Sequence, residues 1–291
     1  MLNQLWFLLI VPGLPLGGLL LWMHSTARKR EQQFRRPFDD MLRPAGWSLQ
    51  KRSADIWESI TEDLMACMLA AVGAWAVWLS NKDMFWTALV LGLISCSYFA
   101  LRAKRRVLEY SNHRLELLGE QVVGQILDRL SSETVRVFHD LEVIEPGKKP
   151  WNIDHVALTP AGVFAIETKS RRKPKDTAPN AQQGHKITFD GQQLIFPAPM
   201  QADRHGLDQA QGNANWLADK LTALNGSPIQ VTPVLVFPGW WIDAKGKGPV
   251  SVLNPKNLRS LLTVRKQVLS DLQFSAINAQ LEERCRIDLT R

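Results

Sequence analysis

The stretch NIDHVALTPAGVFAIETKS, residues 152–170, decides the fold of this chain. Apolar and β-branched residues lie on both sides of a Pro-Ala-Gly turn at residues 160–162. This pattern predicts two antiparallel strands, 152–159 and 163–170, joined by a tight turn. Because apolar residues occupy both faces of both strands, we expect the pair to be buried inside a sheet.

The register of this hairpin brings charged side chains together. A two-residue turn pairs Thr159 with Gly162. Counting back along the antiparallel ladder then places Asp154 opposite Glu167. Residues two apart in a strand share a face, so Lys169 points the same way as Glu167. Two carboxylates and one lysine thus converge on strands otherwise made largely of Val, Ile, Phe and Ala.

This cluster has the chemistry of a metal site. Directly opposed like charges are costly unless a cation lies between them. Mg²⁺ binds one or two carboxylates together with waters and phosphate oxygens. The pattern therefore predicts a divalent metal beside Lys169, where the amine can orient water or stabilise charge on a phosphodiester. The simpler interpretation is an exposed strand face that carries one Glu–Lys ion pair.

The remaining elements of residues 111–291 predict an α/β domain, with a mixed sheet flanked by helices. The helices are expected at residues 102–129, 203–224 and 255–272. The strands are expected at residues 134–144, 229–237 and 250–253, with a small hairpin at 187–196.

Residues 1–110 predict an all-α membrane region. Three stretches without a charged residue occupy 5–23, 64–80 and 84–101. A helix rises about 1.5 Å per residue, so each stretch approaches the thickness of a hydrocarbon core. We expect three transmembrane helices, the second and third joined by a short loop at residues 80–83. The alternatives are a cleavable signal peptide for the first stretch and a buried soluble hairpin for the other two.

Basic residues predict the orientation of these helices. Nine of them follow the first or third stretch: Arg28, Lys29, Arg30, Arg35, Arg36, Arg102, Lys104, Arg105 and Arg106. The hairpin loop carries only Lys82. We therefore expect an external N-terminus and a cytoplasmic C-terminal domain, as in a multi-pass protein of a bacterial inner membrane. Residues 37–63 predict a loop with a short amphipathic helix at 54–63.

Composition excludes several other classes of protein. The net charge is +7, from 35 Lys and Arg against 28 Asp and Glu, which is too small for a histone-like polycation. The 45% apolar content excludes a disordered chain. Three cysteines are too few for a disulfide framework or a four-thiolate zinc site.

Three blocks of sequence carry a resemblance to a known family. They are the Gly-Glu pair at 119–120, the NIDHV block at 152–156 and the GVFAIETKS block at 162–170. In this order they resemble the nuclease-related domain family, NERD, which is similar to the PD-(D/E)xK, restriction-endonuclease-like superfamily. The resemblance covers roughly residues 112–225 and implies a restriction-endonuclease-like mixed sheet flanked by helices.

The resemblance also implies roles for individual residues. These are Asp154 and Glu167 as metal ligands, Lys169 as the catalytic lysine, and Glu120 as the helix acid that completes the site. Gln209 matches the glutamine commonly found in the following helix, with Gln201 and Gln211 as competitors. The alternatives are a solvated helix acid for Glu120 and a solvated polar face for Gln209.

The implied cofactor is Mg²⁺ or Mn²⁺, and the implied partner is nucleic acid, DNA rather than RNA. Residues 146–175 hold seven Lys and Arg side chains, which a phosphate backbone beside the site would require. A solvated surface loop is an equally good interpretation of that charge. Trp151, Trp240 and Trp241 are candidates for base stacking, although core packing is the commoner role of tryptophan.

The sequence therefore favours a membrane-anchored, divalent-metal-dependent nuclease that acts on the cytoplasmic side, with the lipid bilayer as its second partner. One alternative is a catalytically inactive member that binds nucleic acid without cutting it. The other is a membrane interaction or scaffold protein that uses the same fold for docking. An intact acidic pair with a lysine favours the enzyme, because a buried charge cluster gives a scaffold no benefit.

Overall fold

The computed structural model describes residues 41–174, 185–263 and 266–287, together with residues 19, 22, 23, 25 and 26. The chain divides into two compact units. The helical unit consists of Met1–Asp39 and Ala54–Tyr110, and the α/β unit of Asp40–Ser53 and Ser111–Arg291. The first predicted transmembrane stretch, residues 5–23, lies outside the described residues except for isolated positions.

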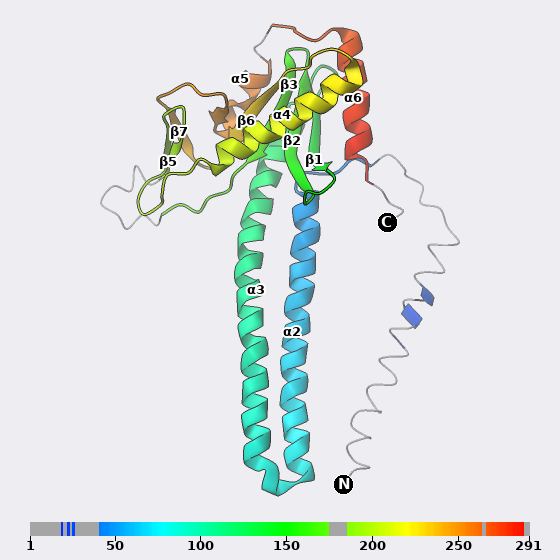
Figure 1. The fold of residues 1–291 in the computed structure, drawn as a ribbon, viewed down its shortest axis with the longest axis vertical. Helices are drawn as coiled ribbons and strands as arrows, with labels where there is room; N and C mark the ends of the chain where they lie inside the picture. The colour runs from blue at the N-terminus through cyan, green and yellow to red at the C-terminus, as the bar shows by residue number, and fades with distance from the viewer. Residues whose placement is uncertain are drawn as a thin grey trace. The chain divides into compact units, whose positions relative to one another are not determined.

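The helical unit contains two long helices joined by a short turn (Figure 1). They are α2 (Trp47–Ser80), the 3-10 helix η1 (Lys82–Met84) and α3 (Phe85–Asp128). The Asn81 side chain accepts a hydrogen bond from the Asp83 N–H at 3.0 Å and caps η1, so the chain turns where predicted. The prediction of a separate short helix at 54–63 is wrong. No proline interrupts the sequence from Trp47 to Ser80, and α2 runs through it as one helix.

Both α2 and α3 are long and apolar enough to cross a membrane. Little of their most apolar windows is buried among the described residues, and large side chains such as Leu69, Trp86 and Ile94 are exposed. Soluble proteins rarely expose so continuous an apolar surface. By length and composition, the two helices are thus compatible with the second and third predicted transmembrane stretches.

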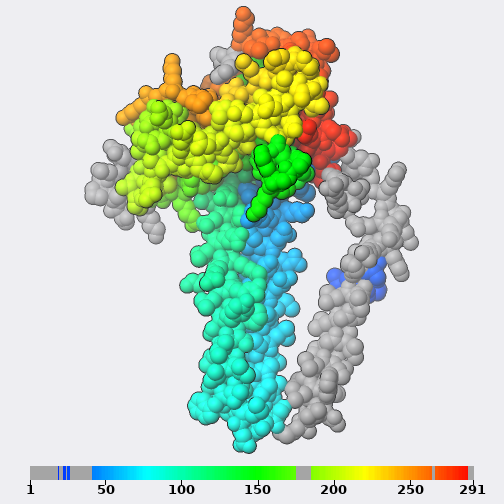
Figure 2. All heavy atoms as spheres, in the orientation of Figure 1, coloured from blue at the N-terminus to red at the C-terminus, as the bar shows by residue number. Residues whose placement is uncertain are grey.

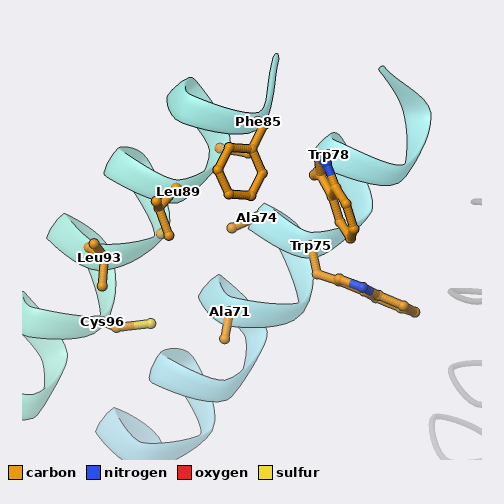
Figure 3. Close-up of a pocket in the computed structure, with 10 residues that line it drawn as sticks. Ala71, Ala74, Trp75, Trp78, Phe85, Leu89, Leu93 and Cys96 are labelled. Atoms are coloured by element: carbon orange, nitrogen blue, oxygen red, sulfur yellow. The ribbon is translucent and has the colours of Figure 1, made fainter. Parts of the chain in front are cut away.

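Small residues allow α2 and α3 to approach each other closely. A Cβ atom added at Gly92 would lie only 2.8 Å from the Cβ of Ala74. Such small residues are typical of helix contacts in hydrocarbon, where close packing replaces the hydrophobic effect. An apolar hollow of about 300 Å³ adjoins this contact. Figure 3 shows its lining, which includes Trp75, Trp78, Phe85, Leu89 and Leu93.

Polar groups between the two helices find partners on the opposite helix. The thiols of Cys67 and Cys96 each donate to the other residue's backbone carbonyl oxygen, at 3.8 and 3.5 Å. The buried Asp63 carboxylate lies 3.4 Å from Arg102 Nη2 and 2.9 Å from Arg106 Nη1. Two arginines therefore neutralise the one acid that the hairpin buries beside its apolar stretches, within the part that the structure describes.

The α/β unit is built on a five-stranded mixed sheet in the order β1-β2-β3-β6-β8. Its strands are β1 (Arg136–Val143), β2 (Trp151–Thr159), β3 (Gly162–Thr168), β6 (Val231–Val236) and β8 (Ser251–Leu253). The pairs β1–β2 and β2–β3 are antiparallel, whereas the pairs β3–β6 and β6–β8 are parallel. Thr159 pairs with Gly162, so the register predicted from the two-residue turn is confirmed.

Helices cover both faces of this sheet. They are α4 (His205–Asn225), α5 (Leu258–Thr263), α6 (Asp271–Cys285) and the last turns of α3. α4 and α6 pack on one face with Val163 and Ala165 of β3, and α5 and α3 pack on the other with Phe164 and Ile166. Figure 1 shows α4 in yellow crossing the strands, and Figure 2 shows its side chains covering that face. Alternation along β3 places Glu167 on the α4 face.

A second, three-stranded sheet has the order β5-β4-β7. It consists of β4 (Lys186–Phe189), β5 (Leu194–Ile195) and β7 (Trp241–Ala244). The β4–β5 hairpin is the one expected at residues 187–196, whereas β7 had no predicted counterpart. Trp240, just before β7, is buried at 1% exposure, and Trp241 is 68% exposed.

The predicted closing helix at 255–272 is wrong. It is replaced by the 3-10 helix η3 (Pro255–Asn257), the short α5 and the separate α6. Between the last two, the N–H groups of Val268 and Leu269 donate to the carbonyl oxygen of Pro160 in the β2–β3 turn. Ser270 then starts α6 through a capping box with Gln273. A continuous helix would have needed the N–H groups of Val268 and Leu269 for its own hydrogen bonds, but the β2–β3 turn accepts them instead.

Two helical glycines give a matched test of how closely α3 approaches the end of β3. A Cβ at Gly119 would lie 1.7 Å from Ser170 Oγ and 3.0 Å from its Cβ, whereas a Cβ at Gly212 meets nothing within 4 Å. Gly119→Ala gains about 1 kcal/mol of helix propensity but costs about 1–3 kcal/mol in overpacking. Gly212→Ala only gains. We expect the first variant to lower, and the second to raise, the thermal midpoint of the full chain in detergent. Equal shifts would contradict the close contact at Gly119.

Candidate functional site

The centre of the candidate site is formed by Asp154 on β2 and Glu167 on β3. The ladder pairs His155 with Ile166, and the same register continued by one residue sets the two acids opposite each other. Asp154 is 9% exposed and Glu167 is 2% exposed. The Asp154 Oδ2 atom accepts a hydrogen bond from the Thr168 N–H at 2.7 Å. The β3 backbone therefore holds one carboxylate beside the other.

Lys169 completes this group from the residue after β3. Its Nζ atom lies 2.8 Å from Glu167 Oε1 and 2.8 Å from Gln209 Oε1 on α4. Its backbone N–H donates to the carbonyl oxygen of Val236 on β6, which extends the parallel pairing. The ammonium group is thus fixed between a carboxylate and an amide on the α4 face.

Of the three glutamines weighed from the sequence, Gln209 is the one that contacts the lysine. Gln211 instead donates to Asn215 along α4, at 2.8 Å, and Gln201 is exposed before the helix. The solvated polar face considered for Gln209 is therefore not its environment.

Glu120 lies on α3 and is buried, with 8% of its surface exposed. The pKa of its carboxyl group is raised to about 8. Burial is the largest cause, followed by the negative charges of Asp140, Glu167 and Glu116, while Lys169 opposes the shift. Interaction with Glu167 and Lys169 means that this helix acid belongs to the same electrostatic cluster.

Burial and mutual repulsion also act on the other site residues. The pKa of Asp154 is raised well above its usual value by burial and then by Glu167 and Glu120. Burial likewise raises the pKa of Glu167, against the attraction of Lys169. Burial alone would lower the pKa of Lys169, but the neighbouring Glu167 carboxylate raises it overall. Three buried acids thus share a single ammonium group.

Two further residues, which the sequence argument did not assign to the site, hold Glu167 from its other side. Asn213 Nδ2 donates to Glu167 Oε2 at 2.9 Å, and Trp151 Nε1 donates to Asn213 Oδ1 at 3.1 Å. Asn213 is 4% exposed. The sequence could have indicated Asn213 as a site residue, because it follows Gln209 by four residues and therefore lies on the same face of the helix. Trp151, weighed for base stacking or core packing, is a hydrogen-bond donor in this chain of contacts.

His155, which belongs to the NIDHV block, lies on the opposite face of β2 from Asp154. Its Nδ1 atom is 2.8 Å from Nδ1 of His139, whose Nε2 atom is 2.9 Å from Asp128 Oδ1. His155 is fully buried, and burial lowers its pKa well below the usual value. It therefore packs in the core on the α3 side and takes no direct part in the acid cluster.

The basic residues between 146 and 175 come from two segments of the chain. Lys148 lies in the β1–β2 loop, 2.8 Å from Glu145. Arg171 and Arg172 follow β3 and contact Asp203 and Ser111. Lys175 lies outside the described residues. The described cations thus fall into two groups, one in the β1–β2 loop and one that continues directly from Lys169.

The donors of this cluster fit a hard divalent cation. Among the residues that the structure describes, no three Asp, Glu, His or Cys side chains form a complete metal cage. The sequence argument required only two carboxylates, since Mg²⁺ keeps several waters. Buried carboxylates with raised pKa values are in excess over ammonium groups here. A bound cation would remove that imbalance, so Asp154 and Glu167 suit the role of ligands.

The fold and the site define an α/β domain with an opposed Asp–Glu pair, a lysine two residues later and an acid from the preceding helix. Residues 116–238 match the family model of the nuclease-related domain, NERD. The match covers the blocks that carry the resemblance found in the sequence. No curated protein and no solved structure gives a significant match to the chain.

The raised pKa of Glu120 predicts how stability changes with pH in metal-free protein. Between 4.5 and about 8, the folded state keeps a proton on Glu120 that the unfolded state has lost. The unfolded state then binds fewer protons, so Glu120 lowers the free energy of unfolding as pH rises through this range. The difference in thermal midpoint between the parent chain and Glu120→Gln, measured in detergent, should shift in favour of Glu120→Gln as pH rises. A difference that is constant from pH 5 to about 8 would contradict the raised pKa.

Proposed function

We propose that this protein is a membrane-anchored, divalent-metal-dependent nuclease that hydrolyses phosphodiester bonds on the cytoplasmic side. The observation that carries the proposal is the Lys169 Nζ atom, held 2.8 Å from Glu167 Oε1 with Asp154 across the ladder. This arrangement lies within the segment that matches the nuclease-related domain. A fold alone does not define a reaction, whereas this set of side chains suits phosphodiester hydrolysis.

The proposed division of labour follows from the contacts. Asp154 and Glu167 would hold Mg²⁺ or Mn²⁺, which when bound supplies positive charge for the phosphodiester and acidifies water. Lys169, fixed by Glu167 and Gln209, donates hydrogen bonds to the phosphoryl oxygens as negative charge develops on them. Glu120 adds a further carboxylate to the site.

Nucleic acid is the proposed substrate, and DNA is proposed ahead of RNA because of the resemblance to restriction-endonuclease-like proteins. The cations that follow Lys169 and the exposed Trp241 are suited to backbone contact and base stacking. The lipid bilayer is the proposed second partner. Its support is the length and apolar surface of α2 and α3.

The test is a cleavage assay of the full chain in detergent, on labelled single- and double-stranded DNA and RNA. Each substrate is incubated with Mg²⁺, with Mn²⁺ and with chelator, beside the variants Asp154→Ala and Glu167→Ala. Metal-dependent cleavage that both variants lose supports the proposal. Binding of nucleic acid without cleavage by the parent chain would favour the inactive alternative, and neither binding nor cleavage would favour a scaffold.

Lys169 should separate metal binding from catalysis. Lys169→Ala removes no proposed ligand, so metal should bind at least as tightly as in the parent once the nearby positive charge is gone. Cleavage should fall about 10²–10³-fold, because stabilisation of charge in the transition state is lost. Lys169→Arg should rescue poorly, since a guanidinium is bulkier and keeps its proton. Calorimetry with Mn²⁺ and gel assays measure the two effects. The exposed Lys256→Ala is the matched control, and parent-like cleavage by Lys169→Ala would exclude this role.

The proposed topology has three spans, with the C-terminal domain in the cytoplasm. It rests on the nine basic residues that flank the first and third stretches, against Lys82 in the hairpin loop. Reporter fusions after residue 110 should behave as cytoplasmic, and fusions at Asn81 as external. Cytoplasmic behaviour at both positions would contradict the topology.

A further inference from the structure

Residues 41–48, which we call the strap, precede the helical hairpin in sequence but belong to the α/β unit. Backbone hydrogen bonds join the strap to the end of the described chain. The Arg43 N–H donates to the carbonyl oxygen of Cys285 at 2.9 Å, and the Ile287 N–H donates to that of Met41 at 2.8 Å. The strap is therefore tied to the residues at the end of α6.

Side chains tie the strap to β1 as well. Arg43 donates to the carbonyl oxygen of Asp140 at 3.1 Å and to Glu142 Oε2 at 2.9 Å. Asp140 Oδ2 accepts from the Ser48 N–H at 3.1 Å and from its hydroxyl group at 2.6 Å. Ser48 is the second residue of α2, where backbone N–H groups lack a partner within the helix. Asp140 thus caps α2 from a strand that lies far away in sequence.

The backbone of Asp140 is strained to make this cap. Its φ is +53°, and among the described residues it is the one non-glycine residue with positive φ. The β1–β2 register places this position across from Asp154, because His139 pairs with His155 and Leu141 with Ile153. An ordinary strand conformation would turn the carboxylate of Asp140 toward the face of Asp154. In the left-handed conformation, one carboxylate oxygen accepts from Ser48 while the other accepts from Asn152 Nδ2 at 2.8 Å.

The strap also lies directly on the part of α3 that carries Glu120. A Cβ at Gly46 would lie 2.5 Å from Leu117 Cδ1 and 3.7 Å from Glu120 Oε2. One turn further along α3, a Cβ at Gly124 would lie 2.3 Å from the Cβ of Ala45. Glycines on both surfaces therefore permit the contact, and the carboxyl group of Glu120 lies beneath the strap.

We propose that the strap is a positioning element of the candidate site, which holds the carboxyl group of Glu120 in place through Gly46 and the Asp140 cap. The effect of the strap on cleavage rests on the proposed function. The contacts between the strap and α3 do not depend on it. The residue range matched by the nuclease-related family, 116–238, excludes the strap. On this proposal the site of this chain is incomplete without a segment from before the helical hairpin.

A double-mutant cycle in the full chain tests this inference. Gly46→Ala places a methyl group against Leu117 and Glu120 at a φ of +74°. Gly147→Ala is the matched control, because its φ is +78° but nothing lies within 4 Å of the added atom. Cleavage rates and thermal midpoints are measured in detergent for both variants, for Glu120→Gln and for Gly46→Ala combined with Glu120→Gln. Ser48→Ala, compared with Ser260→Ala, serves as a milder pair if Gly46→Ala does not fold.

We expect Gly46→Ala to lower the cleavage rate about tenfold or more, since small displacements of a reacting group are costly. The combined variant should be no slower than Glu120→Gln alone, because the strap acts through that residue. Losses that multiply in the combined variant, or a Gly46→Ala rate equal to that of Gly147→Ala, would overturn the inference.

Failure of the proposed function gives a different result. If the parent chain cleaves nothing, the double-mutant cycle is evaluated from the thermal midpoints alone. This is possible because the contact between residues 46 and 120 is a property of the folded chain. Shifts at the two positions that are not additive then support positioning by the strap. Additive shifts overturn it, whatever the activity of the chain.

Discussion

The pairing of Thr159 with Gly162 starts the antiparallel ladder between β2 and β3, and every later pair follows from it. Side chains alternate along a strand, so a slip of one residue would turn Asp154 and Glu167 to the opposite face, away from α4. The apolar residues between them would be misplaced by the same slip. Burial of the sheet on both faces therefore fixes the register, and the register brings the acids together.

Once the acids are buried, the surrounding polar groups have to satisfy them. Glu167 receives Lys169 on one oxygen and Asn213 on the other, and Trp151 holds Asn213 in turn. Asn213 lies on α4, which packs against the sheet, Trp151 lies on β2, and Lys169 directly follows β3. The carboxylate that lies deepest in the cluster is consequently the one with the least freedom to move, which suits a group that has to present an oxygen in one direction.

Local patterns allowed the central hairpin to be predicted, because its turn and its alternation lie within twenty residues of sequence. The break in the predicted closing helix could not be foreseen, since it depends on Val268 and Leu269 reaching the carbonyl oxygen of Pro160. The site divides in the same way. Its acid pair and lysine follow from register and spacing, and Asn213 could have been found from its helical spacing. The cap that Asp140 provides has no signal in the sequence. It depends on a left-handed backbone at Asp140 and on Ser48, which lies 92 residues earlier in the chain.

The hydrogen bonds between the strap and residues 285–287 join segments from opposite ends of the described chain. During synthesis the strap is made before both long helices, and its partners at residues 285–287 are made after them. The α/β unit consequently cannot close around the strap until residues 285–287 have been made, and pairing across so long a loop is slow. Both long helices are therefore complete before the strap is tied down, so a chain that stopped before residue 285 would carry the helices without the hydrogen bonds that hold the strap.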